Sequence, residues 1–96
     1  MKIKDLNILP KYYNGEWFDG NEKFGPYSWT DWILEKIEGN KLFLKVRPGL
    51  EYKKTSEISF RKKEYDKLTS ENKERLCNIF LNNIGRTIEE ILNLDF

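Results

Sequence analysis

The stretch "WILEKIEGNKLFLKVR", residues 32–47, decides the fold. Its two halves flank Gly39 and Asn40, a dipeptide that supplies the positive φ angle of a two-residue hairpin turn. With these two residues as the turn, a regular register places Trp32 opposite Arg47. We therefore predict an antiparallel β-hairpin over this stretch.

The same register predicts which face of the hairpin packs in the core. The predicted core face is apolar except for one carboxylate, and its residues are Ile33, Glu35, Ile37, Leu42, Leu44 and Val46. On the opposite face, the guanidinium of Arg47 is close enough to stack on the indole of Trp32. We expect the aromatic segment upstream to cover part of this second face, because large exposed apolar patches are rare.

The rest of the chain adds one strand and two helices. "TSEISF", residues 55–60, predicts a third strand that pairs with the hairpin. Thr69 or Ser70 is suited to begin a first helix, whose predicted apolar stripe is Leu76, Ile79, Phe80 and Ile84. Gly85 is suited to end it, and Thr87 and Glu90 have the capping-box spacing of a second helix. The 96 residues thus predict a single α+β domain, a three-stranded antiparallel sheet packed with two C-terminal helices.

Composition excludes several kinds of active site. The chain has no histidine and one cysteine, Cys77. Without histidine no Ser-His or Cys-His nucleophile can form, and one cysteine cannot supply the four N or S ligands of a structural zinc site. A chain of this length also leaves little room for a ligand pocket of about 300–1,000 Å³. We therefore expect no enzymatic activity, no metal and no cofactor.

Charge is unevenly distributed along a chain whose net charge is +1. Residues 12–40 hold six acids and two bases, whereas residues 41–67 hold nine bases and four acids. The two groups either neutralise each other across a sheet or mark separate surfaces. Arg61, Lys62 and Lys63 form a consecutive basic triplet, which leaves a nucleic-acid-associated regulator as an alternative function. The low net charge disfavours this alternative.

The segment 12–32 carries eight of the fourteen aromatic residues, set among turn formers and carboxylates. A core this small cannot enclose them all, so we expect some of them at the surface beside acids. Tryptophan and tyrosine are enriched at interface hot spots, and an acidic rim attracts a basic partner. The predicted partner-binding residues are Trp17, Asp19, Glu22, Tyr27, Trp29 and Asp31, supported by Trp32 and Arg47. The alternative is a lid that completes the core.

The layout of "SWTDWILEKI" (28–37), a hairpin and "SENKERLCNIFLNNIGRTIEEIL" (70–92) resembles the small immunity proteins of bacterial toxin systems. The resemblance implies a non-enzymatic α+β inhibitor that binds a cognate toxin domain in the cytoplasm and occludes its active site. It identifies no particular toxin-binding residue. A phage-encoded inhibitor of a host defence enzyme has the same features, and a structural subunit of a larger assembly is a third possibility.

Three further expectations concern location and assembly. The lone cysteine fits a reducing compartment, and the N-terminus "MKIKDLNILP" lacks the features of a secretory signal, so we expect a cytoplasmic protein. No apolar run approaches the roughly 18–20 residues of a membrane span. The chain leaves open a homodimer formed through a sheet edge.

Overall fold

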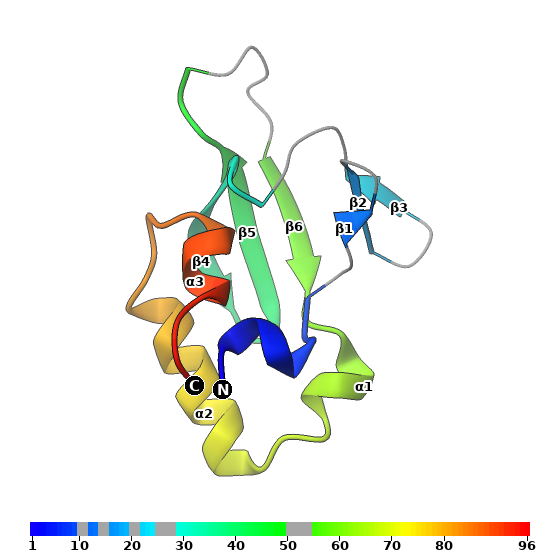
Figure 1. Cartoon of the computed structure of the whole chain (residues 1–96), viewed down its shortest axis with the longest axis vertical. Coiled ribbons are helices and arrows are strands. Elements are labelled where there is room, and N and C mark those ends of the chain that lie inside the picture. Colours follow the sequence, from blue (N-terminus) through cyan, green and yellow to red (C-terminus); the bar gives the residue numbers. More distant parts are fainter. Residues whose placement is uncertain (10–11, 14–15, 20–21, 25–28, 50–54) are drawn as a thin grey trace.

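The computed structural model describes residues 1–9, 12–13, 16–19, 22–24, 29–49 and 55–96, and for 12–13, 16–19, 22–24 and 55–56 it describes the backbone alone. These residues form two antiparallel sheets of three strands each and a set of helices (Figure 1). The main sheet has the order β4-β5-β6, with β4 at Trp32–Glu38, β5 at Lys41–Val46 and β6 at Thr55–Ser59. The predicted α+β class and three-stranded sheet are confirmed.

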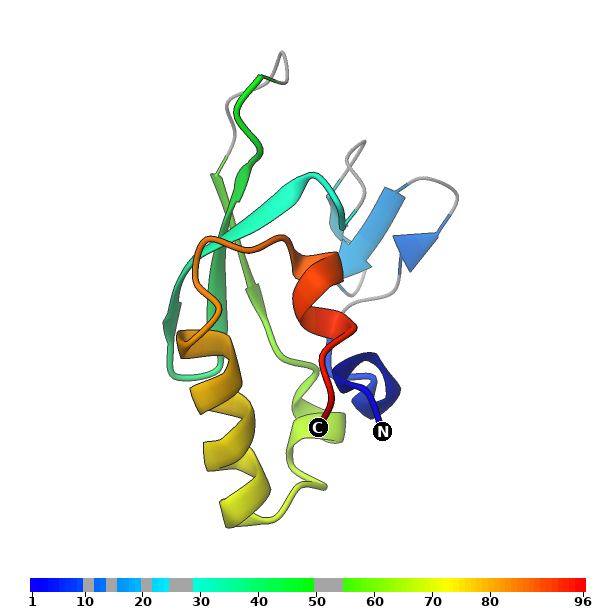
Figure 2. The same ribbon diagram turned by 60° about the vertical axis from the view of Figure 1, so that its left-hand side comes forward.

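The helices lie mostly in the C-terminal part of the chain. They are the 3₁₀ helix η1 at Ile3–Leu6, and the α-helices α1 at Lys62–Tyr65, α2 at Ser70–Leu81 and α3 at Ile88–Leu92. Both α2 and α3 contact β4, and α3 also contacts η1. Figure 2 shows η1 and α3 next to each other on one side of the main sheet. No helix within the described residues is long and apolar enough to cross a membrane.

The core lies between the inner face of the main sheet and these helices. Its buried members in the described part of the chain are Ile3, Ile8, Leu9, Trp32, Leu34, Leu42, Leu44, Val46, Ile58, Phe60, Leu76, Phe80, Ile88 and Ile91. Phe60, the residue that follows β6, contacts Phe80 of α2, and the centroids of the two rings are 5.4 Å apart. Every layer therefore contributes at least one large side chain to one continuous cluster.

A β-bulge in β4 overturns the predicted hairpin register. Leu34 pairs with Leu44 but Lys36 pairs with Phe43, so Glu35 is an extra residue on β4. An extra residue exchanges the two faces of the strand beyond it. Trp32 consequently pairs with Val46, not with Arg47, and is 1% exposed.

The physical reason for the bulge is the cost of the regular register. That register would direct the Glu35 carboxylate into the core, where an unpaired charge is costly. It would also leave the Trp32 indole outside, although an aromatic side chain can bury about 150–250 Å². With the bulge, Glu35 is exposed, Trp32 and Leu34 are buried, and Ile33 is only half-buried.

The outer face of the main sheet is solvated and carries charges of both signs. Lys36 lies over the ring of Phe43, 4.5 Å from its centroid, and pairs with Glu38 at 3.1 Å. Lys41 and Glu57 approach each other to 3.9 Å. These four charged residues are exposed, so the described segments leave the outer face open to solvent at these positions.

The helix ends follow the predicted caps, with one correction. Thr69 accepts a hydrogen bond from Asn72 N at 3.1 Å to begin α2, and Thr87 accepts one from Glu90 N at 3.3 Å to begin α3. Gly85 has the predicted positive φ, at 95°. However, α2 ends four residues before it, and Ile84, predicted for the core stripe, is 46% exposed in the turn.

Candidate functional site

Strands β1 (Tyr12–Tyr13), β2 (Glu16–Asp19) and β3 (Glu22–Phe24) form a small antiparallel sheet of their own, which we name the acidic–aromatic ribbon. Its order is β1-β2-β3, so consecutive strands are neighbours. In Figures 1 and 2 the ribbon lies beside the main sheet and away from α2. The first part of the segment that the sequence singles out, residues 12–24, therefore forms a sheet distinct from the main sheet.

The ribbon register gathers aromatic positions into one row. Tyr12 pairs with Trp17, and Trp17 pairs with Phe24. Directly opposed residues occupy the same face of a sheet. One face of the ribbon therefore has an aromatic residue from each of its three strands in a single row.

Acidic residues occupy the ends of the same strands. Asp19 of β2 pairs directly with Glu22 of β3, at the end where residues 20–21 connect the two strands. Like charges at directly opposed positions destabilise a sheet. A positive group from a partner placed near this pair would remove that repulsion, which makes the pair a candidate contact for a cation.

The segment after the ribbon is fixed to the domain body. The carbonyl of Trp29 accepts a hydrogen bond from Glu89 N of α3 at 3.4 Å, and the carbonyl of Asp31 accepts one from Arg47 N at 2.8 Å. The Arg47 guanidinium donates to the Thr30 carbonyl. Residues 29–31 are thus held by α3 and by the residue that follows β5.

The structure separates the predicted contact residues into groups. Trp17, Asp19 and Glu22 lie in the ribbon, and Tyr27 lies outside the described residues. Trp29 is half-buried against the core and Asp31 is half-buried. The predicted residues therefore come from different parts of the fold, and Trp17, Asp19 and Glu22 of the ribbon remain the candidate contacts.

Trp32 and Arg47 do not play the supporting role predicted for them. Trp32 is a core residue, so its indole is not available to a partner. Arg47 is exposed, but it holds Thr30 instead of stacking on an indole. Both corrections follow from the bulge at Glu35, which moves Trp32 to the inner face and out of register with Arg47.

Sequence reasoning recognised the composition of the ribbon but missed its strands. The signal that identifies them is a pair of dipeptides, Asn14-Gly15 and Gly20-Asn21, of the kind found in two-residue hairpin loops. Each dipeptide lies between two strands in the sequence, and the last residue of the first strand pairs with the first residue of the second. These pairs are Tyr13 with Glu16 and Asp19 with Glu22. The spacing of these turn residues would have indicated the strands of the ribbon, whereas its aromatic content did not.

Within the described residues, no group of three or more histidine, cysteine, aspartate or glutamate side chains is placed to hold a metal ion. Comparisons with protein-family models, curated proteins and solved structures found no match to this chain.

Proposed function

We propose that this protein is a non-enzymatic, protein-binding inhibitor that acts in the cytoplasm in the manner of a bacterial immunity protein. The observation that carries the proposal is the acidic–aromatic ribbon, in which an aromatic row and the opposed pair Asp19 and Glu22 occur in one separate sheet. Aromatic rows supply contact area and opposed carboxylates supply a binding position for cationic side chains. The ribbon covers the basic active-site surface of a nuclease or similar toxin, and inhibition follows from occlusion.

The direct opposition of Asp19 and Glu22 in the strand register supports this interpretation. Like charges at opposed positions of a sheet disfavour each other, and a basic partner offsets that repulsion. Binding is then favoured specifically with partners that place a lysine or arginine at this position. Trp17, next to the acidic pair in β2 and central in the aromatic row, is the predicted hydrophobic anchor.

Co-expression with a candidate toxin domain taken from a neighbouring gene tests the proposal. We expect the wild-type chain to protect cells and to bind the domain in isothermal titration calorimetry. The double variant Asp19→Lys and Glu22→Lys is expected to weaken binding at least about 100-fold and to abolish protection, because charges that attract the partner become charges that repel it.

The matched control is Glu35→Lys with Glu74→Lys, which makes the same change of net charge at two exposed positions outside the ribbon. We expect this control to protect as well as the wild type. Circular dichroism of both double variants separates loss of binding from loss of folding. Full protection by the folded ribbon variant would refute the proposed surface.

A further inference from the structure

The basic triplet consists of Arg61, the residue that caps the start of α1, and Lys62 and Lys63, the first two residues of that helix; we name these three residues the β6–α1 corner. Its backbone is held on both sides, because Arg61 N donates to Ile8 O at 2.6 Å and Arg61 O accepts from Tyr65 N at 2.9 Å. The backbone of Arg61 is therefore held in place by the fold.

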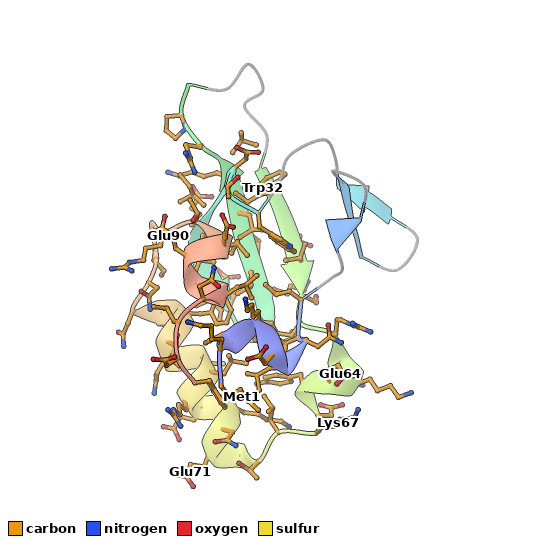
Figure 3. All side chains as sticks on the ribbon, in the orientation of Figure 1. Met1, Trp32, Glu64, Lys67, Glu71 and Glu90 are labelled. Carbon is orange, nitrogen blue, oxygen red and sulfur yellow. The ribbon has the colours of Figure 1, made fainter. Side chains whose placement is uncertain are left out.

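The acids near the corner are paired with other lysines. Glu64 pairs with Lys67 at 3.4 Å, and Figure 3 shows these two side chains together at α1. Asp66 pairs with Lys73 of α2 at 3.9 Å. Among the ion pairs of the described residues, none includes a member of the triplet. Three neighbouring positive charges thus lack a carboxylate within the described part of the molecule.

One atom of the corner is also removed from solvent. Nη1 of Arg61 is buried, and no hydrogen-bond acceptor for it occurs in the described part of the chain. A desolvated cationic N–H without an acceptor is costly to the folded state. Such an atom in a folded protein requires an explanation, and an acceptor supplied from outside the chain is one.

We infer that the β6–α1 corner binds a carboxylate in an acidic segment of a partner protein. Arg61 is half-buried, so part of its side chain is open to a partner, and a guanidinium matches a carboxylate in geometry and charge. The exposed Lys62 and Lys63 attract further acids of the same segment. This surface is separate in sequence from the ribbon and has the opposite charge. The inference therefore does not depend on the proposed function.

The surroundings of the corner favour an acidic peptide over a nucleic acid. Single-stranded nucleic acid is bound by a basic groove with aromatic rings on which bases stack. The neighbouring ring of Tyr65 is occupied instead by Phe60, with centroids 5.3 Å apart, and by Lys73 Nζ, 5.1 Å from its centroid. A net charge of +1 also gives little affinity through counterion release.

Fluorescence anisotropy with fluorescein-labelled hexaglutamate at low salt tests the inference, together with thermal unfolding of the free protein. We expect hexaglutamate binding that weakens as NaCl rises from 20 to 200 mM, on the order of tenfold. Arg61→Met is expected to reduce binding at least about tenfold, yet to leave the unfolding midpoint unchanged or higher, since it removes a buried cation without a partner.

Lys45→Met is the matched control, because it removes one positive charge from the exposed outer face of the main sheet. It is expected to bind hexaglutamate as the wild type does. Three results would overturn the inference: no salt-sensitive binding of hexaglutamate, a lower unfolding midpoint of Arg61→Met with unchanged binding, or tighter binding of a 20-nucleotide oligothymidine through Arg61. The first means that the corner does not bind an acidic peptide, the second assigns Arg61 a structural role, and the third assigns the corner to nucleic acid.

Discussion

Tyr65 is the residue whose ionisation the fold changes most clearly within the described residues. Its hydroxyl lies 4.0 Å from Cys77 Sγ, at the contact between α1 and α2. Burial and, second, the neighbouring Cys77 raise the pKa of the phenol above its ordinary value of 10.0. The folded protein therefore keeps the Tyr65 proton at a pH where the unfolded chain has lost it.

This shift predicts a loss of stability in alkali. Stabilisation by the neutral phenol is complete below the unfolded pKa near 10 and is lost as the pH rises through the higher folded pKa. We expect the unfolding free energy of Tyr65→Phe, measured by urea titration from pH 8 to 11.5, to fall less steeply above pH 10 than that of the wild type. Cys77→Ala should keep most of the wild-type slope, since burial is the larger cause. Parallel profiles for wild type and Tyr65→Phe would contradict the assignment.

At the scale of the elements, the bulge in β4 makes an unusual deletion tolerable. Without Glu35, Lys36 would still pair with Phe43, and Leu34 with Leu44, in a regular ladder with Trp32 on the inner face. We therefore expect the chain lacking Glu35 to fold with the same core and to change the unfolding free energy by no more than about 2 kcal/mol. Urea unfolding and tryptophan fluorescence measure both properties.

The deletion of Lys45 is the matched control, because β5 pairs regularly through this residue with β4 and β6. Removing a residue there exchanges the faces of one part of the strand, so that Val46 leaves the core. We expect this variant not to fold. If the chain without Glu35 also failed to fold, the bulge would have a structural function beyond setting the register.

The bulge also shows how far the elements could be predicted from sequence. Turn dipeptides and caps depend on local geometry, so the turn at Gly39-Asn40 and the caps Thr69 and Thr87 were predicted correctly. Which face of β4 is buried depends on the competition between a carboxylate and an indole for the core. A regular alternation cannot represent that competition, and the error at Glu35 carried over to the predicted pair of Trp32 and Arg47.

The candidate site was predictable in part for the same reason. The aromatic and acidic composition of residues 12–24 identified the segment. The cross-strand pairs that place its aromatic residues in one row and its two acids opposite each other depend on the strand register. The importance of Arg61 could not be predicted, because it depends on which acids the neighbouring lysines already hold. The basic triplet at residues 61–63 is visible in the sequence. The pairing of Asp66 with Lys73 of α2, which leaves the triplet without that acid, is visible only in the structure.

At the scale of the whole molecule, the two ends of the chain are joined to each other. Phe96 N donates to Met1 O at 2.8 Å, and Ile3 N donates to Leu94 O at 3.0 Å. Between these bonds, the backbones of Lys2 and Asp95 form an isolated antiparallel β-bridge. The ring of Phe96 is in turn covered by Arg75 of α2, whose Cζ lies 4.9 Å from the ring centroid. Folding of the 96-residue chain therefore includes the closure of one loop that contains every element.

That closure predicts that joining the ends stabilises the protein. A covalent link removes much of the entropy that the unfolded chain gains when its ends separate, and for a loop of about 100 residues such links contribute on the order of 2–4 kcal/mol. We expect a backbone-cyclised form, closed through a short glycine linker, to have a higher urea midpoint than a linear protein with the same linker at its C-terminus. Because cyclisation leaves the acidic–aromatic ribbon and the β6–α1 corner in place, the cyclised form should bind hexaglutamate as the linear form does. A cyclised form that is less stable than the linear one would mean that the ends are not paired in solution, and that the core closes without them.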